Sequence, residues 1–447
     1  MLAKGGAAVC RPPPHEPALT ITSRLPLGRA HMLASTAIRE ARRAGLPADS
    51  IAPTGSLRRY SPDVGDVSLL ATASLPLQTE VLTGFGHLPS AVGVLSKTAS
   101  SVTIATARGT VTVYVTSPEQ AGAAMAWHTG SRAHTDQLIA RAEHRNLIFR
   151  DAHLQRANGA GITAFSESEL YRHLELPYIP PEMREGHDEI AAAESGALPA
   201  LVSDHHIRGD LHMHTTWSDG RDSLETMVYA AKQLGYEYVA ITDHSERAWS
   251  SRKLAVNDIP RQRADLEAVR EKVNGIQILH GIEVDIMKDG SLDFDDATLE
   301  GFDIVLASLH DHGGQEGPRL TERYLRAIHH PLVNVITHPA NRSPAYSSGY
   351  EVDFDRLFAA AVETGTAMEI DGAPGHLDMD GRLARVAVAG GVTLTIDSDC
   401  HRAEALARQM RFGVGTARRG WVEPRHVLNT RSLDEVRTFI ARKRARR

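Results

Sequence analysis

The second half of this chain alternates short apolar runs with helix-like segments, and histidine, aspartate or glutamate follows most of the runs. The runs have the length of strands and lie at 238–241, 276–282, 304–307, 333–336 and 392–396. The helical segments between them are predicted at 225–234, 259–273, 320–328, 354–364 and 383–389. Repeated strand and helix units predict parallel strands that close into a barrel or form an open sheet. Functional side chains are then expected at the carboxyl ends of the strands.

Seven segments place His, Asp or Glu at or just beyond the end of such a run. They are 210–214, Asp219, 242–244, 281–285, 308–310, 337–339 and 397–401. A single histidine behind a strand is commonly structural, so His338 alone would prove nothing. His212 and His214 are two residues apart on an extended segment, so both can face the same ion. The joint occurrence of these side chains predicts that they converge on a metal site.

The types of ligand narrow the choice of ion. Imidazole and carboxylate without thiolate favour Zn, Mn or Fe over Ca and Mg, which prefer shells of oxygen atoms. Some nine candidate ligands exceed what one tetrahedral ion uses, so two or three divalent ions are expected, with Glu283 as a bridging carboxylate. Such a cluster lowers the pKa of a bound water and holds phosphoryl oxygens during in-line displacement. Hydrolysis of a phosphoester is the predicted reaction.

At these residues the chain resembles a known family. The segment from about Gly209 to Arg442 is similar to the polymerase and histidinol phosphatase (PHP) domain, a metal-dependent phosphoesterase fold described as a distorted seven-stranded β/α barrel. The resemblance implies that one ion is held by His212, His214, Glu283 and Asp399, a second by Glu283, His310 and His338, and a third by Asp219, His244 and His401.

Two further residues beside the proposed ligands are candidates for a catalytic role. Asp243, next to His244, is expected to orient its neighbours, and Arg342 is a candidate for contact with the phosphate of a substrate. An exposed arginine is as often simply solvated. Cys400 lies between two proposed ligands and is expected to be a small buried residue.

The first half resembles the palm of bacterial family X DNA polymerases. The segment Gly55-Ser56-Leu57-Arg58-Arg59 resembles their Gly-Ser-x-Arg-Arg, and Gly65-Asp66-Val67-Ser68 resembles their Gly-Asp-x-Asp. Residues 126–131 resemble the sugar-contacting segment of that family, with Trp127 and His128 in place of two aromatic residues. The segments 176–182, 415–419 and 427–430 match as well, so the resemblance runs from about Pro26 to Ile440.

The polymerase site, however, is incomplete. Polymerase chemistry needs three carboxylates to hold two Mg ions, and here only Asp66 is kept, because position 68 is Ser68 and Thr112 occupies the third position. Hydroxyl groups do not supply the lost charge, so we expect an inactivated nucleotidyltransferase fold without polymerase activity. Gly55, Ser56 and Arg59 of this degenerate site either cradle a phosphate or form an ordinary turn with a surface arginine.

The resemblance and the composition together suggest five segments. Residues 1–20 are expected to be disordered, 21–177 to be a degenerate family X polymerase module without the lyase-like domain that usually precedes it, and 178–207 to be a linker with a short helix at 188–194. The PHP domain then covers 208–441, and 442–447 form a solvated basic tail.

The composition excludes several classes of protein. A formal net charge of −6 argues against a general binder of polyanions. The two cysteines, Cys10 and Cys400, form no disulfide framework and fit a reducing compartment. The sequence shows neither a run of membrane-spanning length nor a signal-peptide pattern, so we expect a cytoplasmic protein without a membrane partner.

The leading functional hypothesis is a metal-dependent phosphoesterase that acts as a 3′–5′ exonuclease or 3′-phosphatase on DNA ends. The first alternative is a phosphomonoesterase of the histidinol-phosphatase type, whose substrate is a small phosphorylated metabolite. The second is a non-catalytic DNA-binding scaffold, against which the full set of ligand residues argues. A fold hosts many substrates, so the sequence does not choose between DNA and a metabolite.

Overall fold

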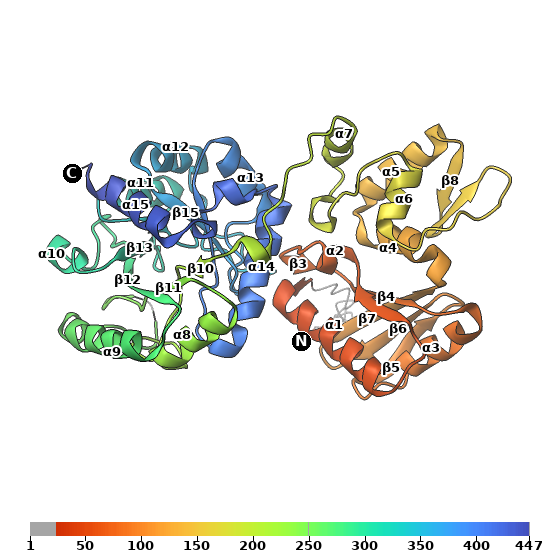
Figure 1. Cartoon of the computed structure of the whole chain (residues 1–447), viewed down its shortest axis with the longest axis horizontal. Helices are drawn as coiled ribbons and strands as arrows, with labels where there is room; N and C mark the ends of the chain where they lie inside the picture. Colours follow the sequence, from red (N-terminus) through yellow and green to blue (C-terminus); the bar gives the residue numbers. More distant parts are fainter. Residues whose placement is uncertain (1–23, 249, 447) are drawn as a thin grey trace, which may run out of the picture.

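The computed structural model describes residues 24–248 and 250–446 of the chain. The segment 1–20, which we expected to be disordered, lies outside the described residues. Two parts of the chain meet beside helix α14 (Leu406–Arg419), which lies next to α1 (Leu27–Arg43) of the other part (Figure 1). Within the described ranges, no helix has the length and apolar character needed to cross a bilayer.

The C-terminal part is a nearly closed barrel of seven parallel strands in chain order. Its strands are β10 (Gly209–Asp210), β11 (Tyr238–Ile241), β12 (Gln277–Asp285), β13 (Ile304–Ser308), β14 (Val335–Ile336), β15 (Ala367–Asp371) and β16 (Leu394–Asp397). The helices around it are α8 (Leu224–Gln233), α9 (Ile259–Lys272), α10 (Asp296–Leu299), α11 (Gly317–His329), α12 (Phe354–Thr364), α13 (Gly381–Ala389), α14 and α15 (Leu433–Arg444). The predicted α/β class with a seven-stranded barrel is therefore confirmed.

Side chains help to close the barrel where the first and last strands meet. The backbone makes one parallel bridge there, between Met213 and Cys400. The Asp397 carboxylate accepts a hydrogen bond from the Leu211 amide at 2.8 Å, and the Asp210 carboxylate accepts one from the Ser398 amide at 3.2 Å. Buried carboxylates thus satisfy amides that a longer strand would pair through its backbone. Both chain segments that leave this seam carry candidate ligands.

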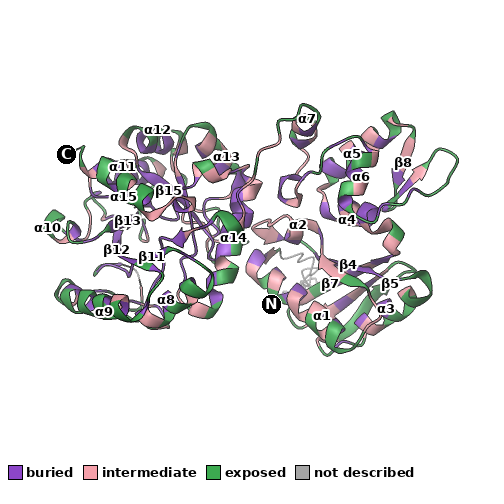
Figure 2. Ribbon diagram, in the orientation of Figure 1, coloured by how far each residue is buried: buried purple, intermediate pink, exposed green. Residues whose placement is uncertain are grey.

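Burial follows the barrel. The strands are buried except at Gln277, where β12 begins, and the outer faces of the surrounding helices are exposed (Figure 2). Helix α11 illustrates the pattern, because Leu320, Tyr324, Ala327 and Ile328 recur at helical spacing and are all buried. Burying such an apolar stripe stabilises the barrel and holds the strand ends in fixed positions.

The N-terminal part is built on a five-stranded sheet with the order β2-β4-β7-β6-β5. Its strands are β2 (Ser50–Pro53), β4 (Val67–Thr72), β5 (Ala91–Lys97), β6 (Ser101–Thr106) and β7 (Gly109–Thr116), and β1 (Leu25–Pro26) pairs with β3 (Asp63–Val64) beside it. Helices α1, α2 (Gly55–Arg58) and α3 (Gln78–Phe85) accompany this sheet. The second subdomain contains α4 (Ala121–Thr129), α5 (Arg132–His144), the hairpin β8 (Leu147–Arg150) and β9 (His153–Arg156), and α6 (Glu167–His173).

The two parts are joined by apolar packing and by ion pairs. Phe412 of α14 and Leu377 of the barrel belong to the same buried cluster as the residues of α1. The predicted linker carries helix α7 (Glu189–Glu194), and Asp188 at its start accepts two hydrogen bonds from Arg385 of α13.

The predicted solvated tail is wrong for Lys443, whereas Arg442, Ala445 and Arg446 are exposed as expected. Helix α15 continues through Arg442, Lys443 and Arg444, and Lys443 is buried. Its ammonium donates to the Ile328 carbonyl at 2.6 Å, at the end of α11, and to the Thr366 hydroxyl. A cation is favoured beside the carbonyls that end a helix, so this lysine anchors the last helix to the barrel.

Candidate metal centre

The structure brings all nine predicted ligands together at the carboxyl ends of the barrel strands. They are His212, His214, Asp219, His244, Glu283, His310, His338, Asp399 and His401. The parallel order of the strands explains the convergence, because parallel strands end at the same rim of a barrel. His338 and Asp399 adopt positive φ values of 26° and 47°, a backbone strain that residues other than glycine tolerate mainly at functional sites.

One group forms around His212, His214 and Asp399. The Nε2 atoms of the two imidazoles are 3.1 Å apart, and Nε2 of His214 lies 3.0 Å from Oδ1 of Asp399. Glu283 joins them, with Oε2 at 3.5 Å from His212 and 3.7 Å from His214. This is the arrangement that the resemblance implied for the first ion.

A second group lies on the other side of Glu283. The Oε1 atom of Glu283 is 3.0 Å from Nε2 of His338 and 3.7 Å from Nε2 of His310. Glu283 lies near the carboxyl end of β12, between the two groups, so its side chain reaches both from one position. The geometry therefore allows the bridging role that was expected of this carboxylate.

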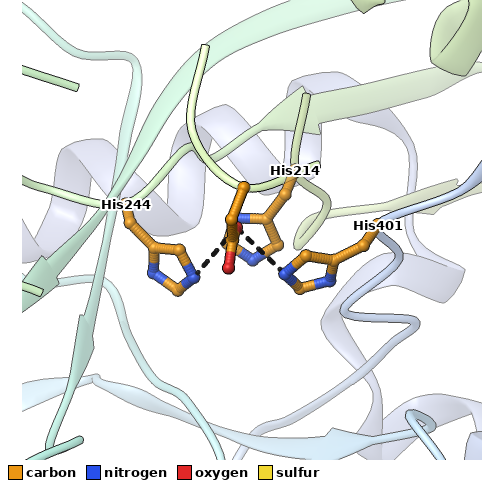
Figure 3. A group of neighbouring side chains, drawn as sticks. His214, His244 and His401 are labelled. Carbon is orange, nitrogen blue, oxygen red and sulfur yellow. Dashed lines mark ion pairs between the residues drawn. The ribbon is translucent and has the colours of Figure 1, made fainter. Parts of the chain in front are cut away.

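A third group contains His214, Asp219, His244 and His401, whose candidate ligand atoms all lie within 4.8 Å of one another. The rings of His214, His244 and His401 surround one carboxylate, and the dashed lines mark its ion pairs with His244 at 3.5 Å and with His401 at 3.1 Å (Figure 3). His401 is 33% and Asp219 is 19% exposed, whereas His212 and His214 are fully buried. The third group thus faces the opening of the site.

His244 takes part in two groups. Its Nε2 faces Asp219, while its Nδ1 lies 2.7 Å from Oε2 of Glu283. The resemblance placed His244 with the third ion alone, but the structure also groups it with Glu283 and His310. The three groups share side chains and cannot be filled independently.

The chemistry of the donors fits divalent metal ions. Nδ1 of His214 is buried and has no hydrogen-bond partner among the described residues, and Oδ1 of Asp219 and Oε2 of Glu283 are buried beside imidazole nitrogens, at 3.1 and 2.7 Å, without a hydrogen bond of good geometry. Such atoms are costly to bury unless something satisfies them, and a cation satisfies all three. The same region holds carboxylates from several strands, whose charges also require compensation.

Electrostatics prepare three groups of the site for metal binding, whereas at His212, His310 and His401 burial is outweighed by nearby carboxylates, which raise the pKa of each imidazole, that of His401 to about 9. Burial lowers the pKa of His214 to about 3 and that of His338 to about 4, so both imidazoles are neutral near pH 7. Burial would raise the pKa of Glu283, but His244, His212 and His310 outweigh it and hold that pKa well below the usual value. Metal ligands must be neutral imidazoles or ionised carboxylates, and these three groups meet that requirement.

Three carboxylates outside the predicted set of ligands hold the imidazoles in place. Glu369 of β15 accepts a hydrogen bond from Nδ1 of His212 at 2.7 Å. Asp285 lies 3.2 Å from Nδ1 of His310, and Asp371 accepts a bond from Nδ1 of His376 at 2.9 Å. Fixing one ring nitrogen leaves the other directed into the site, which raises its basicity as a ligand.

A fourth candidate group was also not predicted. Asp371, His376 and Asp399 offer ligand atoms within 4.8 Å of one another. The sequence does contain a sign of this group, because Glu369 and Asp371 are two residues apart in the run 367–371. In a strand, two such carboxylates lie on the same face. The charges made this run look unlike a buried strand, so β15 was not among the predicted strands.

The two catalytic candidates lie beside the cluster. Asp243 is fully buried and accepts hydrogen bonds from Thr215, Ser218 and Gln262, at 2.6 to 3.1 Å. Its oxygens are thus occupied in holding the loop between His214 and Asp219. Arg342 is largely buried and pairs with Asp380 at 3.3 Å.

In the N-terminal sheet, the positions of the expected polymerase carboxylates lie side by side. Ser68 of β4 is directly opposite Thr112 of β7 in the parallel register, and Asp66 is exposed just before β4. The Ser68 hydroxyl accepts a hydrogen bond from Thr54 at 2.9 Å, and the hydroxyls of Thr112 and Thr103 are 3.0 Å apart. The two hydroxyls are therefore bonded within the sheet, and one carboxylate faces solvent.

The Gly-Ser-x-Arg-Arg segment forms the short helix α2. Gly55 has φ of +62°, and a Cβ atom there would approach the Ser68 hydroxyl at 3.0 Å, while Ser56 is half-buried in the first turn. Arg58 forms a salt bridge with Glu167 at 2.6 Å. Arg59 pairs with Glu185 at 3.0 Å and donates to the Thr129 carbonyl at 2.7 Å. The expected phosphate cradle is thus largely occupied by internal partners.

Comparison with known proteins identifies the family. The PHP domain matches residues 210–368, and the DNA polymerase beta thumb matches residues 124–185. A protein of Bacillus subtilis named DNA polymerase/3′-5′ exonuclease PolX is 34% identical over 392 residues, which cover 87% of this chain and 68% of that protein.

This chain belongs to the PolX family. These are the bacterial family X DNA polymerases with a C-terminal PHP domain, as the resemblance in both halves predicted. Relatives that match about half of this chain include proteins named probable phosphatase, one from Shewanella oneidensis at 32% identity over 209 residues (44% of this chain and 77% of that protein) and one from Caldanaerobacter subterraneus at 28% over 250 residues (53% and 92%). PolX membership and the PHP match make this chain a member of a metal-dependent phosphoesterase and exonuclease family, and the thumb match points to DNA as a partner.

Proposed function

We propose that this PolX protein is a 3′–5′ exonuclease or 3′-phosphatase acting on DNA ends, and that it has no polymerase activity. The observation that carries the proposal is the cluster of nine imidazole and carboxylate groups at the rim of the barrel, with its buried unpartnered atoms. The name of the Bacillus subtilis relative includes both activities, and only the site for the second has its full set of groups in this chain. The same cluster argues against a non-catalytic scaffold.

The nine candidate ligands would hold up to three metal ions. His212, His214, Glu283 and Asp399 would hold one ion, and His310 and His338 would hold a second together with Glu283. Asp219, His244 and His401 would hold a third at the opening of the site. Divalent ions such as Zn or Mn, with Fe as a further candidate, would neutralise phosphoryl oxygens and activate water.

The residues around the ligands would position the substrate and the cluster. Glu369 would keep His212 in the tautomer that presents Nε2 to the ion. Asp243 would act as a positioning residue through the loop 215–218 and not by touching the substrate. Arg342 pairs with Asp380, so it would contact a phosphate only by exchanging that partner.

The test of the exonuclease proposal uses a 5′-labelled single-stranded oligonucleotide with Mn or Zn. The full chain should shorten it from the 3′ end or remove a 3′-phosphate, and His212→Ala or Glu283→Ala should abolish both reactions and lower the metal content. His144→Ala, an exposed histidine at the end of α5 and far from the barrel rim, is the matched control for a lost imidazole. Full turnover in His212→Ala would remove the cluster from the mechanism.

The proposed loss of polymerase activity has a separate test. Primer extension with Mg or Mn and all four deoxynucleotides should give no product, because Asp66 is the only carboxylate of the expected three. Extension that depends on the template and disappears in Asp66→Ala would refute this part of the proposal.

A second candidate function is hydrolysis of a small phosphomonoester of the histidinol phosphate type. The relatives named probable phosphatase favour it, because they match only about half of this chain. Histidinol phosphate and labelled single-stranded DNA should therefore be compared in the same assay. A higher turnover of histidinol phosphate than of DNA, with no dependence on salt concentration, would favour the metabolite as substrate. Activity on DNA should instead fall with salt, because phosphate contacts with DNA weaken as the salt concentration rises.

A further inference from the structure

A groove of about 280 Å³ lies where the N-terminal half meets the barrel. One wall is the start of helix α1, with Arg29 and Met32, and the opposite wall contains Tyr346 and Pro374 from two loops of the barrel rim. Arg408 of α14 also lines it. Figure 1 shows α1 and α14 side by side at this junction, and the rings of His31 and Phe412 pack there at 5.3 Å.

The groove lies next to the candidate metal centre. One of its lining residues, Gly375, directly precedes His376, whose Nδ1 lies 2.9 Å from Asp371 and 3.6 Å from Asp399. The groove residue Ser343 directly follows Arg342 on the other rim loop. A chain that emerges from the metal centre past His376 would therefore enter the groove.

The groove carries positive charge that no internal partner neutralises. Arg29 and Arg408 line it, both are exposed, and neither forms an ion pair or hydrogen bond with any residue in the described part of the chain. None of the lining residues is acidic. Helix α1 begins here without a side-chain cap, so its positive end adds to the charge. This contrasts with Arg58 and Arg59, which are paired internally.

The groove also offers an exposed aromatic surface. The Tyr346 side chain is 70% and the Met32 side chain is 42% exposed, on opposite walls. Unpaired bases stack on exposed aromatic rings whatever their sequence, and nearby arginines bind the backbone phosphates. An exposed aromatic ring in a groove that also holds two free guanidinium groups suits single-stranded nucleic acid better than a small anion, which would need no such ring.

We propose that this groove binds the single strand on the 5′ side of the phosphodiester that is cleaved. A base stacks on Tyr346, and the neighbouring phosphates contact Arg29 and Arg408. This inference rests on the proposed action on DNA ends and specifies how the strand is held. It also gives the N-terminal half a direct part in the site, because α1 supplies one wall. A strand already stacked in a duplex would not offer its base to Tyr346, so the bound segment is unpaired.

The test measures binding and not turnover. The metal-loaded full chain is titrated against a fluorescein-labelled hexanucleotide with phosphorothioate linkages at its 3′ end, and fluorescence anisotropy reports the dissociation constant. Tyr346→Ala should weaken binding about tenfold, as the loss of one stacked base typically does. Arg29→Ala and Arg408→Ala should each weaken binding and reduce the slope of log K against log salt by about 0.7, the value for one phosphate contact on a single strand.

The controls change the same groups elsewhere. Arg43→Ala removes an exposed arginine from the far end of α1, and Tyr229→Ala removes a tyrosine that is 41% exposed on α8. Both should bind the hexanucleotide as the unchanged protein does. Elemental analysis should find the same metal content in all five variants, which excludes indirect damage to the metal centre.

The outcomes separate this inference from the proposed function. Tight binding that is lost in the groove variants, without any cleavage of an ordinary oligonucleotide, would support the groove and refute the exonuclease proposal. If the protein cleaves DNA and Tyr346→Ala, Arg29→Ala and Arg43→Ala bind the hexanucleotide with equal affinity, the exonuclease proposal stands and the proposal that the groove binds DNA is refuted. The occupant of the groove would then be something other than DNA. No measurable binding by the unchanged protein would overturn the groove as well.

Discussion

Replacing Glu369 by glutamine should weaken metal binding, although Glu369 is not a predicted ligand. Glu369 is fully buried, and its two oxygens accept hydrogen bonds from Nδ1 of His212 and from the His338 amide, each at 2.7 Å. Both of these donors belong to residues of the candidate metal centre. A glutamine keeps the shape of the side chain but has only one oxygen, so its amino group would face one of the two donors.

The size of the effect follows from those two bonds. A buried donor left without its acceptor costs about 1–3 kcal/mol, and every 1.4 kcal/mol corresponds to about tenfold in an equilibrium constant. Glu369→Gln loses one of the two bonds and turns an amino group toward a buried donor. We therefore expect the affinity for the ion beside His212 to fall about 10- to 100-fold, which is the range found when groups that orient metal-binding histidines are removed.

The assay is competition between the protein and a chelator of known affinity for Zn or Mn, followed by elemental analysis. Glu182→Gln is the matched control, because Glu182 is also a mostly buried carboxylate but pairs with Arg418, away from the barrel rim. Thermal unfolding of the metal-loaded variants checks that both fold. A metal affinity of Glu369→Gln within twofold of the unchanged protein would refute the reasoning, because His212 would then not depend on Glu369 for its orientation.

Three further predictions concern stability. Removal of metal by a chelator should lower the unfolding temperature, and addition of Zn or Mn at about a hundred times the dissociation constant should restore about 2.7 kcal/mol, as differential scanning calorimetry would show. Burial lowers the pKa of His128 from 6.5 to about 4, so the unfolded chain takes up the proton first and up to about 3 kcal/mol of stability should be lost as the pH falls from 6.5 to 4; urea unfolding of His128→Phe should show a weaker dependence over that range. Glu185→Ala leaves Arg59 and Arg419 without their shared carboxylate and should cost about 1–3 kcal/mol in urea unfolding, while an unchanged midpoint would show that these ion pairs add no stability.

Much of the barrel could be predicted from the sequence because its signals are local. The strand at 238–241 and the helix at 354–364 have the predicted bounds, since an uninterrupted apolar run and an amphipathic stripe each identify one element. The candidate ligands lie just after such runs, so their convergence followed from the parallel order of the strands. The start of strand β14 was predicted at 333, but pairing begins at Val335.

The missed features depend on contacts between residues that are distant in the sequence. Strand β15 carries Glu369, whose partner His212 lies 157 positions away, so nothing near residue 369 indicates why a charge is buried there. Arg59 was expected either to contact a phosphate or to lie free on the surface, yet Arg58 and Arg59 pair with Glu167 and Glu185, 109 and 126 positions away. A short motif shows which chemistry a side chain offers but does not show which neighbour uses it.

The internal pairing of Arg58 and Arg59 limits how this protein could be re-engineered. Aspartates at positions 68 and 112 would stand opposite each other in neighbouring strands and, with Asp66, would complete a set of three carboxylates. An incoming triphosphate would still find Arg58 bonded to Glu167 and Arg59 bonded to Glu185, and Glu185 also pairs with Arg419 of α14 in the barrel part. Releasing the arginines would loosen the contact between the two halves, so a designer would have to choose between a nucleotide pocket and a firmly attached barrel.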